Sequence, residues 1–90
     1  ERAGDVMLDV SYSKQSLKFL KHADNVLQGR LMKKIEELRV KPFLHDTKTV
    51  EGYKEKLFRV RVGDYRILYE YEIPRNYLGI VKIDKRPKVF

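Results

Sequence analysis

The fold of this chain is decided by residues 57–71, which read LFRVRVGDYRILYEY. Two runs rich in β-branched and aromatic residues, 57–62 and 65–73, flank the dipeptide Gly63-Asp64. Such a dipeptide is typical of the two-residue turns that join hairpin strands, because these turns need positive φ angles. The stretch therefore predicts an antiparallel β-hairpin in which Arg61 faces Arg66.

Side chains alternate between the two faces of a strand, so this register also assigns a face to each residue. One face is apolar and aromatic, and we expect helices to cover it: Phe58, Val60, Val62, Tyr65, Ile67, Tyr69 and Tyr71. The opposite face carries Arg59, Arg61, Arg66 and Leu68, with Glu70 and Glu72 further along. A slip of one residue would exchange the two sets, so the inference depends on the turn.

The residues before the hairpin predict a short strand and two helices. Val6, Leu8 and Val10 alternate with Met7 and Asp9, which is the pattern of a strand. Ser13 and Asp24 are suited to cap helices, because their side chains can accept hydrogen bonds from free backbone amides. The first helix runs from Lys14 to about His22 and has three apolar residues, Leu17, Phe19 and Leu20.

The second helix has an apolar stripe made of Leu27, Leu31, Ile35 and Leu38. It should end near Val40, because Pro42 disfavours helical geometry in the residue before it. Residues 41–56 are polar and irregular and predict a connecting segment, with Phe43, Leu44 and Val50 as its anchor points.

A last strand is expected from Leu78 to Ile83, followed by a basic tail from Lys85 to Phe90. Continued alternation predicts Val81 and Ile83 in the core, and Lys82, Asp84 and Arg86 on the basic face. The fold class is therefore α+β: an N-terminal strand, a two-helix hairpin, then a β-hairpin and a further strand in one sheet packed on the helices.

Composition limits the classes of function that are open to the chain. The 90 residues make one domain, 1–90, of which 1–5 have no periodicity and are expected to be a frayed or vector-derived end. The net charge is +7, which favours an anionic partner. The absence of cysteine excludes disulfides, thiolate nucleophiles and cysteine-bound zinc, and fits a cytoplasmic location. No apolar stretch is long enough to span a membrane.

The pairing of Arg61 with Arg66 is a local electrostatic conflict, because like charges directly opposite each other destabilise a sheet. A bound phosphate would turn the two guanidinium groups into a preformed fork of donors. The alternative is an ordinary solvated face whose repulsion is relieved by Glu70, Glu72 and water. His22 and His45 are too isolated to predict a metal site, so we expect no metal or other cofactor.

The string from Phe58 to Tyr71 strongly resembles the core motif of the RelE/ParE toxin superfamily. The opening from Val10 to Leu20 is similar to the first strand and helix of that family, and the segment from Lys85 to Phe90 is similar to its closing basic segment. The resemblance implies a cytoplasmic toxin that an acidic antitoxin neutralises. RelE-like members cleave mRNA in the ribosomal A site, whereas ParE-like members act on DNA gyrase.

If the chain is RelE-like, the resemblance implies an endoribonuclease (an mRNA interferase) with four catalytic arginines: Arg59, Arg61, Arg66 and Arg86. Further contacts to RNA are expected from Lys82, Lys85, Lys54, Lys56 and Phe90. The alternatives are a gyrase inhibitor without nuclease activity and a catalytically weakened RNA-binding relative.

The chain departs from the family at its last residue. Many RelE-like toxins have a tyrosine near the end that takes part in proton transfer, and Phe90 has no such hydroxyl. Arginine stays protonated and is a poor general base. The base is therefore left open among Lys82, Lys85, Glu70 and a group of the ribosome.

Overall fold

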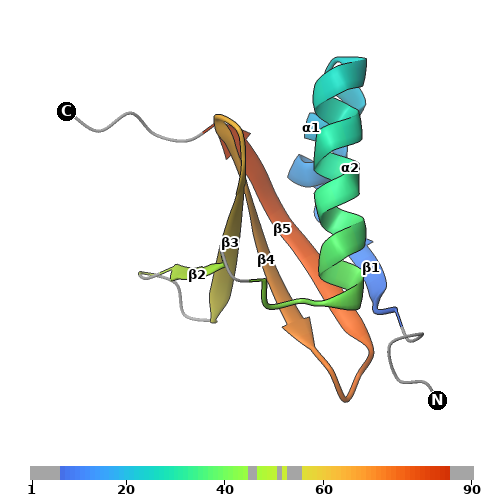
Figure 1. The fold of residues 1–90 in the computed structure, drawn as a ribbon, viewed down its shortest axis with the longest axis vertical. Helices are drawn as coiled ribbons and strands as arrows, with labels where there is room; N and C mark the ends of the chain where they lie inside the picture. Colours follow the sequence, from blue (N-terminus) through green and yellow to red (C-terminus); the bar gives the residue numbers. More distant parts are fainter. Residues whose placement is uncertain (1–6, 45–46, 51, 53–55, 86–90) are drawn as a thin grey trace.

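The structure is a computed structural model that describes residues 7–44, 47–50, 52 and 56–85. Its elements are β1 (Asp9–Tyr12), α1 (Lys14–His22), α2 (Asn25–Val40), β2 (Lys48–Val50), β3 (Leu57–Val62), β4 (Tyr65–Glu72) and β5 (Tyr77–Lys85). The five strands form one sheet in the order β1-β5-β4-β3-β2, with β1 parallel to β5 and the other pairs antiparallel. The predicted α+β class is confirmed (Figure 1).

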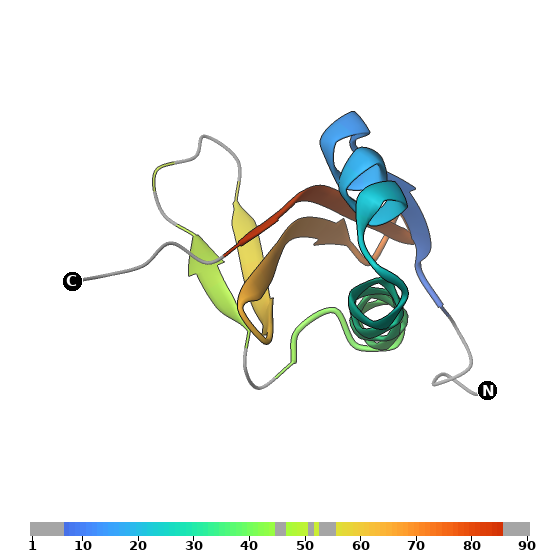
Figure 2. The same cartoon turned by 90° about the horizontal axis from the view of Figure 1, so that it is seen from above.

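Both helices lie on one face of the sheet, where α1 packs on β1 and β5 and α2 contacts β3, whereas the edge strand β2 lies away from them (Figure 2). The predicted caps are confirmed: the Ser13 side chain accepts a hydrogen bond from the Ser16 amide at 3.1 Å, and Asp24 accepts one from the Leu27 amide at 2.8 Å. Among the described residues, no helix is both long and apolar enough to cross a membrane.

The apolar stripe of α2 forms the centre of the core. Leu31, Ile35 and Leu38 are fully buried, and Leu27 packs at the margin. The hairpin face that was expected to be apolar supplies the opposite wall with Phe58, Val60, Val62, Ile67 and Tyr69, all buried. In α1, Leu20 joins the core, but Leu17, another of the three apolar residues of this helix, is 52% exposed. Buried Ser16 takes the core-facing position instead, and its hydroxyl donates to the Ile80 carbonyl at 3.2 Å.

The segment expected to be irregular contains an additional strand, β2, which pairs with β3. Three residues are too few for an alternation pattern to indicate a strand. The segment is fixed by Tyr69, whose hydroxyl lies 3.0 Å from the Thr47 hydroxyl and donates to the Pro42 carbonyl at 2.5 Å. Leu44 packs against the core as expected, but Phe43 is 59% exposed and is a weak anchor.

A β-bulge in β5 changes which of its residues face the core. Tyr69 pairs with Ile80 and Leu68 with Lys82, so Val81 is an extra residue between two regular stretches. The core residues are therefore Ile80 and Ile83, and the expectation that Val81 points to the core was wrong. Lys82 and Asp84 still lie on the predicted basic face, because the alternation resumes after the bulge.

Leu68 also lies on the face that the alternation assigned to it, but it is 1% exposed, and its neighbour Leu57 on that face is 4% exposed. The face opposite the helices therefore contains two buried leucine side chains among its charged residues.

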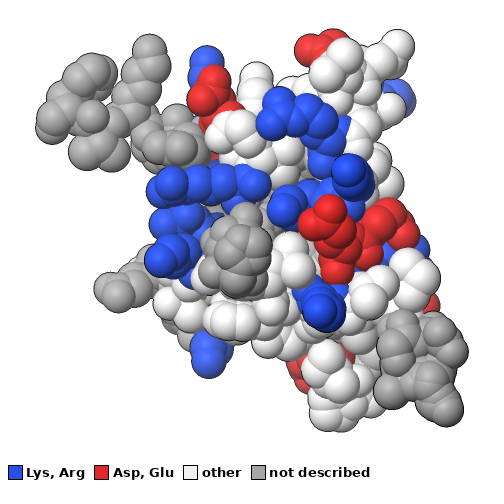
Figure 3. Space-filling model, viewed as in Figure 1, with Lys and Arg blue, Asp and Glu red and all other residues white. Residues whose placement is uncertain are grey.

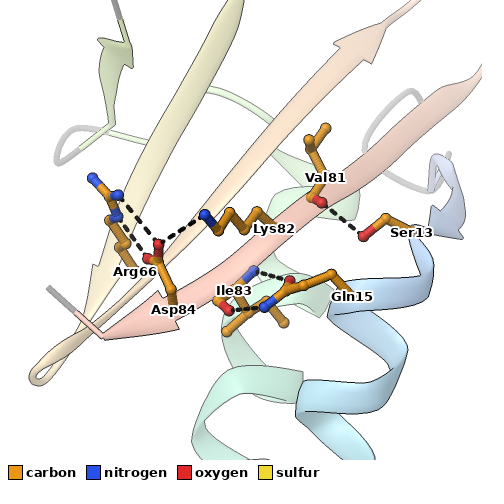
Figure 4. Close-up of polar contacts among 7 residues, drawn as sticks. All are labelled: Ser13, Gln15, Arg66, Val81, Lys82, Ile83 and Asp84. Atoms are coloured by element: carbon orange, nitrogen blue, oxygen red, sulfur yellow. Dashed lines mark hydrogen bonds and ion pairs between the residues drawn. The ribbon is translucent and has the colours of Figure 1, made fainter.

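Gln15 extends the sheet at the point where β1 ends. β1 pairs with β5 only as far as Ile80, and beyond that the Gln15 side chain satisfies the next part of the β5 edge. Its amide nitrogen donates to the Ile83 carbonyl at 2.7 Å, and its oxygen accepts from the Ile83 amide at 2.9 Å (Figure 4). Ser13 contributes a further bond, from its hydroxyl to the Val81 carbonyl at 2.7 Å.

Replacing Gln15 by alanine is expected to destabilise the protein by about 1–3 kcal/mol, because two backbone groups of Ile83 lose their partners. Chemical denaturation measures this change. Lys18→Ala, an exposed position on the same helix, is the matched control and should change stability by less than about 0.5 kcal/mol. Equal stability of the two variants would show that the Gln15 bonds contribute nothing.

Candidate functional site

The sheet face opposite the helices, called the outer face here, collects the cations of four strands. The register defines two cross-strand rows, one of Arg61, Arg66 and Asp84 and one of Lys48, Arg59, Leu68 and Lys82. Residues directly opposite each other point to the same side of a sheet, so five cations and one carboxylate share this surface. In Figure 3, Lys and Arg side chains gather on the side of the molecule where β2, β3 and β4 lie.

The turn between β3 and β4 fixes the register of these rows. Gly63 has a φ of 60°, in the left-handed region that glycine adopts without strain. A Cβ atom on Gly63 would also lie 2.9 Å from the Arg30 guanidinium, which packs against the turn. The expected pairing of Arg61 with Arg66 is confirmed.

Asp84 forms the main ion pair of the site with Arg66. The Nε atom of Arg66 donates to Oδ1 of Asp84 at 2.7 Å, and Nη2 donates to Oδ2 at 3.2 Å (Figure 4). Each side chain is 24% exposed, and Lys82 Nζ lies 3.7 Å from the same carboxylate. Arg61, in contrast, is exposed, and within the described ranges the structure gives it no hydrogen bond or ion pair.

Asp84 therefore offsets the repulsion between Arg61 and Arg66, a role that the alternative of a solvated face assigned to Glu70, Glu72 and water. Those two carboxylates have other partners: Glu70 accepts a hydrogen bond from the Tyr77 hydroxyl at 3.0 Å, and Glu72 pairs with Arg75 at 3.4 Å.

The end of the outer face that carries Glu70 and Tyr77 has a different chemistry. The Tyr77 ring lies over Gly79, where a Cβ atom would collide with its hydroxyl. Burial raises the pKa of Tyr77, and the hydrogen bond to Glu70 raises it further, so the phenol stays protonated at neutral pH. The acidic end thus holds a neutral hydroxyl and a carboxylate already bound to it.

The structure brings Arg59, Arg61, Arg66 and Lys82 together, as expected. It separates Lys85, which pairs with Tyr65 and by alternation lies on the helix side of the sheet. Lys56 lies with its Nζ 5.6 Å from the centre of the Phe58 ring, away from the arginines. The other predicted site residues, Arg86, Lys54 and Phe90, lie outside the described residues, as do residues 1–5 and His45.

One member of the site and one pairing within it were not predicted. Lys48 was missed because β2 was read as part of a connecting segment. Asp84 was placed on the correct face, but its pairing with Arg66 depends on where the bulge falls.

Among the described residues there is no group of His, Asp and Glu side chains that could hold a metal ion. His22 instead places Nδ1 2.9 Å from the Lys18 carbonyl.

A small α+β domain with an arginine-rich hairpin on its sheet is the arrangement expected of the RelE/ParE superfamily of toxins. A family model described as the ParE toxin of the type II toxin–antitoxin system parDE matches residues 10–90. The chain therefore belongs to this family and is a toxin of a type II toxin–antitoxin system.

Solved structures agree with this assignment. A chain of the archaeal RelE–RelB complex from Pyrococcus horikoshii OT3 is 25% identical, with a TM-score of 0.79 over 92% of this chain and 99% of that chain. The RelBE2 toxin–antitoxin complex of Mycobacterium tuberculosis gives 20% identity and a TM-score of 0.76, covering 91% and 94%. The isolated RelE toxin of E. coli gives 15% and 0.75, covering 91% and 87%. The last two likenesses concern the fold alone. No curated protein matches the chain in sequence.

Proposed function

We propose that this toxin is a ribosome-dependent endoribonuclease that cleaves mRNA in the A site. The observation that carries the proposal is the row in which Arg61 and Arg66 face each other on neighbouring strands, with Arg66 held in place by Asp84. Two guanidinium groups on directly opposite residues of neighbouring strands can bind one phosphodiester, because each presents several N–H donors to the phosphate oxygens.

In the proposed reaction, the 2′-hydroxyl of one nucleotide attacks the adjacent phosphate, and the bond to the 5′-oxygen of the next nucleotide breaks. The products are a 2′,3′-cyclic phosphate and a free 5′-hydroxyl. The phosphoryl oxygens gain negative charge in the transition state, and preorganised cations stabilise that charge. Arg61 and Arg66 hold the phosphate, while Arg59, Lys48 and Lys82 contact the flanking backbone.

The position of the available bases supports a dependence on the ribosome. Glu70 lies four residues along β4 from Arg66, about 14 Å away at the rise of an extended strand. Lys85 lies on the helix side of the sheet, and Asp84 uses both oxygens on Arg66 and Lys82. Lys82 lies beside the clamp, but it pairs with Asp84 as an ammonium, which carries donors and no acceptor. The part of the chain that the structure describes thus offers a phosphate clamp without a well-placed base, which the ribosome would have to supply.

The test uses purified toxin, ribosomes programmed with labelled mRNA, and the same mRNA free in solution. We expect cleavage at the A-site codon on ribosomes, products ending in a cyclic phosphate, and little cutting of free mRNA. A 2′-O-methyl group at the scissile nucleotide should block the cut, because it removes the nucleophile. Intact mRNA on ribosomes, or equally fast cutting of free mRNA, would contradict the proposal.

A second candidate is inhibition of DNA gyrase, which the match to the ParE family model favours. That function needs no converging phosphate clamp. A supercoiling assay with purified gyrase separates the two: inhibition of supercoiling together with intact ribosomal mRNA would establish this alternative.

The partner that neutralises the toxin is proposed to be an acidic antitoxin. The +7 charge of the chain and the cations of the outer face complement an acidic segment. The archaeal and mycobacterial structures that it resembles are themselves toxin–antitoxin complexes.

A further inference from the structure

Asp84 occupies the position on Arg66 that an incoming anion would take. Its carboxylate binds the guanidinium side-on through two hydrogen bonds, the same geometry that a phosphate uses with arginine. We propose that Asp84 is a specificity-determining residue that competes internally for Arg66, so that the outer face holds a phosphodiester weakly unless further contacts keep it there.

The sheet itself sets this competition. Arg66 and Asp84 are direct cross-strand partners in β4 and β5, so backbone pairing places their side chains together. Both side chains are three-quarters buried, which limits the screening of the pair by water. A chance meeting of two flexible surface side chains would have neither property.

The charges around Arg66 explain how the competition would act. Arg61 on β3 faces it from one side, Asp84 on β5 holds it from the other, and Lys82 lies near the same carboxylate. An anion bridging Arg61 and Arg66 must therefore share Arg66 with Asp84 or displace it. The lost Arg66–Asp84 bonds are subtracted from the binding free energy of every such ligand.

The proposal rests on the proposed function only in naming RNA as the ligand, since the competition itself concerns any phosphate. Its significance for the toxin would be selectivity. A weakened affinity for free RNA leaves the ribosome, with its many additional contacts, as the place where the substrate is held.

The test compares Asp84→Asn with wild type and with Glu72→Gln, a control that removes one carboxylate at the other end of the outer face. The ligand is a fluorescent 2′-O-methyl RNA oligonucleotide, which cannot be cleaved, and binding is followed by anisotropy. Asp84→Asn should tighten binding by roughly fivefold, the size expected for a partly exposed ion pair, and Glu72→Gln by less than about twofold.

A second measurement separates competition from a merely structural role. Asp84→Asn should melt at a lower temperature than wild type in phosphate-free buffer, because the repulsion between Arg61 and Arg66 is then uncompensated. Inorganic phosphate should raise the melting temperature of this variant more than that of wild type. A structural role alone would give the first change without the second.

The double variant Arg66→Ala/Asp84→Asn completes the test and should lose the gain in affinity. Persistence of the gain without Arg66 would overturn the proposal, as would a gain in Asp84→Asn no larger than in Glu72→Gln. Because neither probe requires cleavage, these results stand apart from the nuclease assays. A toxin that binds phosphate as described but cuts no mRNA would contradict the proposed function and leave the role of Asp84 intact.

Discussion

Replacing Arg61 by alanine is expected to lower the rate of mRNA cleavage on ribosomes by about 10²–10³-fold, the loss typical of removing one donor to a developing oxyanion. Arg61 is exposed and, within the described ranges, has no protein partner, so its guanidinium is available to a phosphate. Its loss removes stabilisation of the transition state, because the extra charge on the phosphoryl oxygens arises only there. Single-turnover cleavage with saturating toxin measures the effect.

The stability of the Arg61→Ala variant should change in the opposite sense to its activity. Arg61 faces Arg66 across the hairpin, and removing one of two opposed like charges should stabilise the sheet by up to about 1 kcal/mol. Loss of activity without loss of stability identifies a residue kept for function at a cost to the fold. Arg66→Ala should differ, because it leaves Asp84 without its main partner and lowers stability as well.

Arg75→Ala is the matched control, since Arg75 is an exposed arginine in the turn beyond Glu72. It should retain cleavage within about twofold and lies outside the proposed phosphate clamp. Equal rates for Arg61→Ala and Arg75→Ala would contradict the role of Arg61. A drop in the melting temperature of Arg61→Ala would instead indicate that the residue supports the fold.

Much of the fold could be predicted because its main elements carry short-range signals. The caps Ser13 and Asp24 and the stripe from Leu27 to Leu38 are local features, and the hairpin register follows from a two-residue turn. β2 could not be predicted, because a three-residue strand is too short to show alternation. The segment before it is held by the Tyr69 hydroxyl, which lies 22 residues away from Thr47 in the sequence.

The site was predicted in part for the same reason. Arg59, Arg61 and Arg66 belong to one hairpin, so alternation alone brings them to one face. Lys48 and Asp84 come from other strands, and their places depend on the edge pairing of β2 and on the bulge at Val81. A single sequence gives the net charge and shows which residues of a strand share a face. It does not show which charged residue pairs with which.

The position of the site on the sheet follows from how the helices are placed. Because α1 and α2 cover one face, the other face is left open to a partner (Figure 2). Among the described apolar residues of the outer face, only Leu57 and Leu68 are buried. These two side chains pack beneath the charged side chains of that face. The same sheet thus builds the core on one side and carries the proposed binding surface on the other.

Replacing Ile35 by alanine is expected to destabilise the protein by about 2–5 kcal/mol, because the change leaves a cavity in the fully buried part of the core. Ile35 is fully buried in the middle of the α2 stripe, between Leu31 and Leu38 and against the sheet. A domain of this size has roughly 5–10 kcal/mol of stability in total, so the variant should lose a large part of it. The melting temperature should fall by roughly 10–30 °C.

Val26→Ala tests whether burial rather than helix propensity causes this loss. Val26 is 74% exposed on the same helix, and its replacement should change stability by less than about 0.5 kcal/mol. Comparison with Arg61→Ala then separates two ways of losing toxicity in cells: Ile35→Ala should lose it through unfolding, and Arg61→Ala while folded. If Ile35→Ala melted at the same temperature as Val26→Ala, the packing of α2 on the sheet would be wrong, and with it the face on which the arginines are placed.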